Sequence, residues 1–371
     1  MMKGIIKTEK GKYRATFDHG TINGERDRRY KTYKTLEEAE KALTEFNYNK
    51  QRNLLVTSNK MTLAEFIEYW MENYVKHKCE ETTKYGYNNI INKHIIPYFK
   101  ELELQSLQPI HIQQYYNFLM NVKGLSANTV IKHHACLRKC LNFGLKQQFV
   151  HRNVADAVEL PKKKRFEGKS YTTLQLKELF KKVRDEKLEV AVCLAGYLGL
   201  RREEVIGLKW ENIDFANRII NIVEVRTSAG KQVVIKRPKT EESKRKLFIP
   251  DELFEVLTRH KEKQNYFKSI LKSEYVDLDY VYTKDNGELY RVNTITEQFK
   301  AFLKKNDLPP IRFHDLRHSV ASILYDQNVD LKAISELLGH SDIATTTKIY
   351  THRFDKTHMK TITAMTAALH A

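Results

Sequence analysis

The chain of 371 residues has few cysteines, few prolines and glycines, and no long apolar run. Its 4 cysteines form no CxxC pair and fall in apolar, helix-like patterns, which favours buried thiols in a reduced, intracellular protein over a disulfide framework. With 14 glycines and 7 prolines, long disordered stretches are not expected. The longest apolar run, 191–200, is far shorter than the roughly 18 residues of a membrane span, and residues 1–13 lack an apolar signal core. The sequence therefore predicts a cytoplasmic protein.

Positive charge is what the sequence has in excess. Lys and Arg number 64 against 46 Asp and Glu, which gives a formal net charge of +18 at pH 7. Such a surplus attracts polyanions, because neutralising their charges releases condensed counterions. Nucleic acid is therefore the expected partner, although charge alone is also compatible with a ribosome, a membrane surface or a protein that is merely basic.

The length predicts two or three domains, which we place at 1–56, 57–160 and 161–371. The expected fold is mainly α with small β elements (α+β). In the first domain, three strand-like runs with a turn at Asn23-Gly24 precede a helix that a capping box at Thr35 opens.

The expected three-stranded sheet carries basic and aromatic residues at polar positions. They are Arg14, Arg28, Arg29, Tyr30 and Tyr33. A sheet backed by one helix can place its open face in a DNA groove. The alternative is a small scaffold whose basic face is merely solvated.

The second domain shows apolar residues three and four apart in four successive segments. These predict helices at 62–76, 82–98, 107–122 and 126–148, and hence a compact helical module. Within the last segment, His133, His134, Cys136 and Cys140 suggest a metal site, but the spacing of the two cysteines along an apolar stripe favours core packing.

The third domain begins after a charged linker at 161–165. Most of its length shows helical periodicity, and three runs are strand-like. Helices are expected near 172–184, 188–200, 251–268, 294–305, 314–327, 330–338 and 342–350. The strand-like runs RIINIVEVR and QVVIKRPK predict a hairpin that turns near 228–230, and KRKLFIP predicts a third strand.

The stretch FHDLRHS places His314, Arg317 and His318 on one helical face, since residues three and four apart are neighbours. Three potential cations there invite an anion. His314 and His318 have the spacing of a zinc pair, but an arginine between them would repel a dication. A guanidinium instead matches the oxygens of a phosphate, which indicates phosphoryl chemistry without a metal.

Two further motifs accompany this stretch. LGLRREE at 198–204 sets Arg201 where a helix ends at Gly199, and GHSDIATTTKIYTH at 339–352 sets His340 after a second helix-ending glycine, Gly339. In this order, in a basic chain, the three motifs resemble the tyrosine recombinase family, the integrases and site-specific recombinases of phages and mobile elements. The resemblance covers essentially the whole chain.

The resemblance implies a set of catalytic residues. Arg201 matches the first arginine of the family, with Glu204 at its accompanying acidic position, and His314 and Arg317 match its His-x-x-Arg. The remaining matches are His340 at the third His/Trp position, Tyr350 as the nucleophile and Lys239 as the hairpin lysine, with Lys236, Lys244 and Lys246 close by.

The resemblance also implies a mechanism that needs neither a metal, a cofactor nor ATP. Arg201 and Arg317 would clamp the scissile phosphate, and Tyr350 would attack it to form a 3′-phosphotyrosyl link. Lys239 would protonate the leaving 5′ oxygen, His314 would assist proton transfer, and His340 would donate a hydrogen bond to the phosphate. His318 is expected to support its helix rather than to touch substrate.

The family resemblance further implies partners. Four protomers would act on two double-stranded DNA duplexes through a Holliday junction, and the tail at 356–371 would dock on a neighbouring subunit or fold back on its own domain. Because the N-terminal sheet resembles the arm-binding domain of phage and transposon integrases, we expect integration and excision of a mobile element, with an excisionase and a host DNA-bending protein as partners. The alternatives are a chromosome- or plasmid-resolving recombinase, a non-catalytic DNA-binding regulator of the same fold, and a metal-dependent nuclease.

Overall fold

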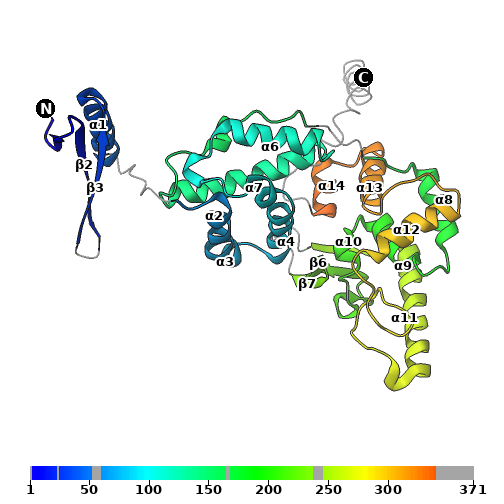
Figure 1. The fold of residues 1–371 in the computed structure, drawn as a ribbon. Coiled ribbons are helices and arrows are strands. Elements are labelled where there is room, and N and C mark those ends of the chain that lie inside the picture. Colours follow the sequence, from blue (N-terminus) through cyan, green and yellow to red (C-terminus); the bar gives the residue numbers. More distant parts are fainter. Residues whose placement is uncertain (1, 23–24, 52–59, 164–167, 237–244, 340–371) are drawn as a thin grey trace, which may run out of the picture. The chain divides into compact units, whose positions relative to one another are not determined.

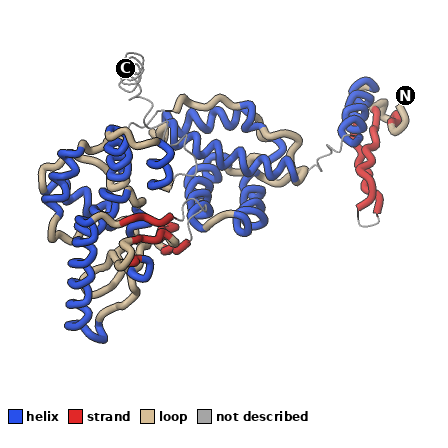
Figure 2. Tube along the Cα trace, turned by 180° about the vertical axis from the view of Figure 1, so that it is seen from behind, coloured by secondary structure: helices blue, strands red, loops and turns tan. Residues whose placement is uncertain are grey.

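The computed structural model describes residues 2–22, 25–51, 60–163, 168–236 and 245–339 (Figure 1). The chain divides into two compact units, Met1–Arg165 and Phe166–Ala371. In the described residues of both units helices predominate over strands, and the strands form small antiparallel sheets (Figure 2), so the predicted α+β class is confirmed. Within the described ranges, no helix combines the length and the apolar character needed to cross a membrane. The predicted three-domain boundaries stay a prediction.

The N-terminal part is a three-stranded antiparallel sheet covered by one helix. Its elements are β1 (Ile5–Lys7), β2 (Tyr13–Ile22), β3 (Glu25–Tyr33) and α1 (Leu36–Gln51), with strand order β1-β2-β3. The capping box is confirmed, since Glu38 N donates to Thr35 Oγ1 at 3.2 Å and Thr35 N donates to the Glu38 carboxylate at 3.3 Å. The predicted Asn23-Gly24 turn lies outside the described residues.

The strand register divides the five predicted basic and aromatic positions between the two faces of this sheet. Tyr33 pairs with Tyr13, and both pack in the small core under α1. Residues alternate between faces along a strand, so Arg14, Arg28 and Tyr30 lie on the open face, whereas Arg29 shares the side of Tyr33. The Arg14 guanidinium lies 5.4 Å from the Tyr30 ring centre, a cation–π distance.

The four predicted helices of the helical module are confirmed. The structure has α2 (Leu63–Trp70), η1 (Met71–Val75) and α3 (Lys76–Lys78) in one continuous run, α4 (Glu81–Ile90), η2 (Ile91–Ile95) and α5 (Ile96–Phe99) in a second, then α6 (Pro109–Asn121) and α7 (Ala127–Lys146), with short 3₁₀ turns η3 (Leu104–Ser106) and η4 (Val154–Ala157). The first two runs each contain a π-helical segment, which apolar spacing does not reveal. Trp70, Tyr115 and Tyr116 are the largest side chains of the shared core.

Cys136 and Cys140 of α7 are core residues, as their spacing predicts, and His133 is buried beside them, whereas His134 is half-buried. Cys136 and Cys140 are each 1% exposed. His133 Nδ1 lies 2.8 Å from the Tyr115 hydroxyl, and His134 makes the same contact with a neighbouring tyrosine at 2.9 Å. Burial, reinforced by the nearby His94, lowers the pKa of His133 from 6.5 to about 4.

This buried imidazole makes the helical module sensitive to acid. The unfolded chain binds a proton near pH 6.5 and the folded chain only near 4, so the stability contributed by neutral His133 is present above pH 6.5 and lost as the pH falls to about 4. We expect the free energy of unfolding to fall by up to about 3 kcal/mol over this range from His133 alone. Urea unfolding followed by Trp70 fluorescence, in a Trp210→Phe background, measures it. The His133→Gln variant should show a shallower pH dependence, and an unchanged slope would contradict this account.

The second unit is built around α9 (Glu189–Leu198). This helix packs against α8 (Thr173–Val183), α11 (Asp251–Leu271) and α13 (Asp315–Asp326). The further helices are α10 (Arg202–Val205), α12 (Thr294–Lys305), α14 (Leu331–Leu338) and the 3₁₀ turns η5 (Trp210–Asn212) and η7 (Lys272–Glu274). These helices confirm the predicted ones, apart from 342–350, which lies outside the described residues.

The strands of this unit correct one prediction. RIINIVEVR was expected to be one strand of a hairpin, but it divides between two sheets. Its first half contains β5 (Ile219–Ile222), which pairs with β4 (Ile213–Asp214) and β8 (Arg245–Phe248). Its last two residues begin β6 (Val225–Ala229), which pairs with β7 (Gln232–Lys236).

The division has a physical cause. Ile220 and Ile222 face the core beside Leu247 of β8, while Glu224, just after them, lies 3.4 Å from Lys209 in an ion pair. The buried strand β5 therefore ends before Glu224, because this carboxylate pairs with Lys209 rather than entering the core. KRKLFIP is a strand, as predicted, and it pairs with β5 rather than with the β6–β7 hairpin.

Candidate active site

The site begins where α9 ends. Gly199 has φ +64°, the left-handed conformation that favours glycine at a helix end, as predicted. A Cβ atom at this position would lie 2.4 Å from Leu338 Cδ2, so the chain leaves α9 in close contact with α14. Arg201 follows directly before α10, where its backbone N donates to Glu204 Oε2 at 2.8 Å.

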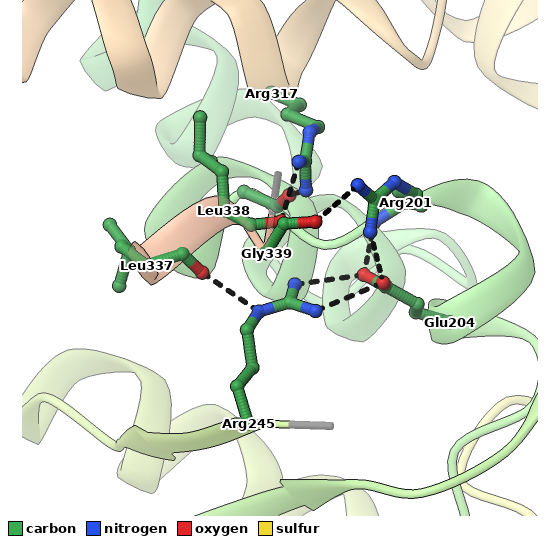
Figure 3. Close-up of polar contacts among 8 residues, drawn as sticks. Arg201, Glu204, Arg245, Arg317, Leu337, Leu338 and Gly339 are labelled. Carbon is green, nitrogen blue, oxygen red and sulfur yellow. Dashed lines mark hydrogen bonds and ion pairs between the residues drawn. The ribbon is translucent and has the colours of Figure 1, made fainter. Parts of the chain in front are cut away.

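Three guanidinium groups from distant parts of the sequence meet at the carboxyl end of α14 (Figure 3). Arg245, Arg317 and Arg201 donate to the carbonyl oxygens of residues 337, 338 and 339, in that order. The bonds from Arg245 and Arg201 measure 2.8 and 2.7 Å. The last carbonyls of a helix lack partners within it and form the negative end of its dipole. They therefore hold these cations in place.

A buried carboxylate joins two of the three arginines. Glu204 is 2% exposed and accepts Arg201 Nη1 at 2.8 Å and the two terminal nitrogens of Arg245 at 3.0 Å each. Its burial by itself would raise its pKa, but the hydrogen bond and charge of Arg245, together with those of Arg201, outweigh burial and hold the pKa below its usual value. Glu204 is therefore ionised, and it fixes both guanidinium groups.

The arginines differ in their access to solvent. The Arg201 side chain is 30% exposed, whereas that of Arg245 is 7% exposed and Arg317 is 2% exposed. Arg317 Nη1 also donates to the carbonyl of Gly199 at 2.9 Å, so one guanidinium joins the end of α9 to the end of α14. Arg201 is thus the arginine of this cluster that reaches the surface.

His314 stands at the N-cap of α13, with its ring centre 5.2 Å from that of His318. Desolvation, then the charges of His318 and Arg317, lower the pKa of His314, and desolvation lowers the pKa of His318. Of the three potential cations on this face, Arg317 is therefore the one that keeps its charge at neutral pH. Near pH 7 both imidazoles are neutral, and the charge of the face is that of Arg317.

A second carboxylate anchors the start of α13. Asp315 is 2% exposed and accepts the backbone N of Arg312 at 2.9 Å and its Nη2 at 2.6 Å. Both bonds span three residues, so they fix the turn that carries His314. Among the described residues, no three His, Cys, Asp or Glu side chains gather as a metal ion would require.

The predicted site residues fall into two groups. The structure brings Arg201 and Arg317 together on adjacent carbonyls and sets His314 close enough to Arg317 to feel its charge. Lys239, His340 and Tyr350 lie outside the described residues. Their predicted roles stay predictions.

Sequence reasoning missed Arg245. In KRKLFIP it stands among other basic residues that are typical of a solvated strand. Alternation along the strand was the available signal, because Arg245 lies two residues before Leu247 and so shares its core-facing side. The register bears this out, since both pair with buried isoleucines of β5.

Comparison with known proteins identifies the class of protein that this arrangement represents. Residues 169–357 match the Phage integrase family, and residues 62–120 match the Phage integrase, N-terminal SAM-like domain. The first match alone spans more than half of the chain. The chain belongs to the phage integrase family.

Two similar proteins extend over nearly the full length. The chain is 28% identical over 375 residues to the tyrosine recombinase XerC-like protein of Caldanaerobacter subterraneus subsp. tengcongensis, covering 95% of each chain. It is 28% identical over 359 residues to the ICEBs1 integrase of Bacillus subtilis, covering 94% of this chain and 95% of that one. The predicted relationship to tyrosine recombinases is thereby confirmed.

Solved structures show the same fold. The Tn1549 transposon integrase in complex with a circular intermediate DNA matches with a TM-score of 0.68 at 18% identity, covering 81% of this chain and 99% of that one. A lambda integrase tetramer bound to a Holliday junction matches with a TM-score of 0.58 at 17% identity, covering 92% and 96%.

Proposed function

We propose that this protein is a site-specific DNA recombinase that integrates and excises a mobile element by cutting and rejoining DNA through a 3′-phosphotyrosyl intermediate. The observation that carries the proposal is the convergence of Arg201 and Arg317 on one helix end, stabilised by a buried carboxylate. A phosphate is the anion whose paired oxygens such planar groups recognise.

The chemistry begins with Tyr350. A free phenol has a pKa of about 10, so attack at neutral pH requires a proton acceptor and cations near the phosphate. Neutral His314 has a lone pair for this proton, because its pKa is lowered. The phenolic oxygen forms a bond to phosphorus, and the bond from phosphorus to the 5′ oxygen breaks.

The departing 5′ oxygen takes a proton from Lys239, and His340 donates a hydrogen bond to the phosphate. Arg201 and Arg317 offset the charge that develops on the non-bridging oxygens, which is the largest contribution that such sites make. The energy of the broken phosphodiester stays in the phosphotyrosyl link for rejoining. The reaction therefore needs no ATP, and guanidinium groups take the role that metal ions have in nucleases.

DNA binding is assigned to all three proposed domains, 1–56, 57–160 and 161–371. The open face of the N-terminal sheet, with Arg14, Arg28 and exposed Tyr30, suits arm-type attachment sites. The helical module and the catalytic domain would clamp the core site. The net charge of +18 supports this wide contact with DNA and an association with the nucleoid in the cytoplasm.

The solved relatives also support assembly on DNA. One of them is a tetramer bound to a Holliday junction, and another is in complex with a circular intermediate DNA. We assign the same homotetramer to this protein, together with an excisionase and a host DNA-bending protein.

A nicked suicide substrate in EDTA tests this function. Wild-type protein should form a covalent protein–DNA adduct on a denaturing gel, Tyr350→Phe should form none, and Tyr266→Phe, which changes an exposed tyrosine of α11, should match wild type. Cleavage that needs added metal and leaves no adduct would indicate a nuclease instead. Binding without cleavage would indicate a regulator.

A further inference from the structure

Arg245 occupies a place in the cluster that the proposed chemistry does not use. It comes from β8, its side chain is 7% exposed, and it contacts both Glu204 and the carbonyl of Leu337. We infer that Arg245 is a positioning residue for DNA cleavage. It fixes the phosphate-binding guanidinium of Arg201 and the C-terminal end of α14 relative to each other. The inference rests on the proposed function.

The geometry couples Arg245 to Arg201 through one carboxylate. Both terminal nitrogens of Arg245 donate to Glu204, one to each oxygen, at 3.0 Å. The same two oxygens accept Nη1 and the backbone N of Arg201, each at 2.8 Å. A bidentate pair restricts the carboxylate in two directions. Arg245 therefore determines where both the side chain and the backbone of Arg201 lie.

The geometry also couples Arg245 to the end of α14. Its Nε donates to the carbonyl of Leu337, and the next two carbonyls accept Arg317 and Arg201. Gly339, at φ +63°, allows this approach, since a Cβ atom there would lie 2.9 Å from Arg245 Nη1. The Arg245 guanidinium thus holds the last turn of α14 beside Arg201 and Arg317, the proposed phosphate-binding residues.

Only an arginine satisfies these contacts together. Its planar fork presents three nitrogens in fixed directions, two toward a carboxylate and one toward a carbonyl, whereas lysine offers one compact ammonium. Lysine at this position would keep the charge and give up the geometry. Arg245→Lys therefore separates positioning from neutralisation of Glu204.

Single-turnover cleavage of the suicide substrate tests the inference. Arg245→Lys should lower the rate of adduct formation by about 10- to 100-fold, since small misplacements of catalytic groups have effects of this size. Its affinity for DNA should not change. In an Arg201→Ala background the same substitution should lower the rate by less than about 3-fold, because residues that act as a unit are not additive. Arg259→Lys, which alters an arginine paired with Glu189 outside the cluster, is the matched control.

A substrate with an uncharged methylphosphonate at the scissile position distinguishes positioning from a general structural fault. Without the negative charge, the placement of Arg201 matters less, so Arg245→Lys and wild type should cleave this substrate at similar rates. A loss of the same size on both substrates, full additivity with Arg201→Ala, or an unimpaired Arg245→Lys would each overturn the inference. Glu204→Asp, which keeps both charges and moves the carboxylate away from Arg201, replaces Arg245→Lys if the lysine variant does not fold by circular dichroism. If the wild-type protein forms no covalent adduct, the proposed function is wrong. This outcome differs from the three that would overturn only the inference about Arg245.

Discussion

Replacing Arg201 or Arg317 by alanine is expected to slow formation of the covalent adduct by about 1,000-fold or more, while DNA affinity changes by less than about 3-fold. The rate should fall because, in the proposed mechanism, these guanidinium groups neutralise the charge that develops on the phosphate. The affinity should change little because DNA binding is distributed over the whole basic surface. Quenched single-turnover cleavage gives the rate, and fluorescence anisotropy with intact sites gives the affinity.

The two substitutions should differ in their structural cost. Arg201 is partly exposed, so its loss mainly affects chemistry, whereas Arg317 is buried and bonded to two carbonyls, at the ends of α9 and α14. Arg317→Ala should therefore also lower the melting temperature. Arg218→Ala, which changes an exposed arginine paired with Asp251, should alter neither property. Undiminished cleavage by Arg201→Ala would contradict the clamp.

Replacing Glu204 by alanine is expected to have the largest effect on stability. The change leaves Arg245 buried without its carboxylate, and removing one partner of a buried ion pair costs about 3–5 kcal/mol. For a unit of this size the melting temperature should fall by about 10 °C. Cleavage should also fall, because Arg201 loses both of its bonds to this carboxylate and keeps the bond to the carbonyl of Gly339.

The neighbouring Glu203 provides the control. Its side chain is 32% exposed and pairs with Arg202 at 2.7 Å, so Glu203→Ala should cost less than about 1 kcal/mol. Thermal unfolding by calorimetry compares the two variants directly. If Glu204→Ala and Glu203→Ala melt at the same temperature, the buried carboxylate does not hold the cluster together.

Helix positions followed from local signals that the chain carries within a few residues. The capping box at Thr35 sets a helix start, and Gly199 and Gly339 set helix ends, since each signal depends only on groups a few residues away. The order of the three motifs around Arg201, Arg317 and Tyr350, in a basic chain, was sufficient to predict the family. The helix ends depend on local residues, and the family resemblance depends on the order of the motifs along the chain.

Features that depend on distant partners could not be predicted in the same way. The division of RIINIVEVR between two sheets depends on β8 and on Lys209, neither of which the alternation of that segment contains. The neutral state of the two histidines of α13 depends on how closely other elements surround them. Alternation along β8 places Arg245 on the core-facing side, but its partner Glu204 comes from a segment 41 residues earlier, so its role in the cluster could not be predicted locally.

The central claim is that a phenolic oxygen at Tyr350 displaces the 5′ end of a DNA strand while distant arginines hold the phosphate. Mass spectrometry of the trypsin-digested adduct tests it most directly. Trypsin cuts after Lys348 and Arg353, so the account predicts that the peptide 349–353, which contains one tyrosine, carries a nucleotide through a phosphodiester bond. A nucleotide on any other peptide, or an adduct that persists in Tyr350→Phe, would contradict the account.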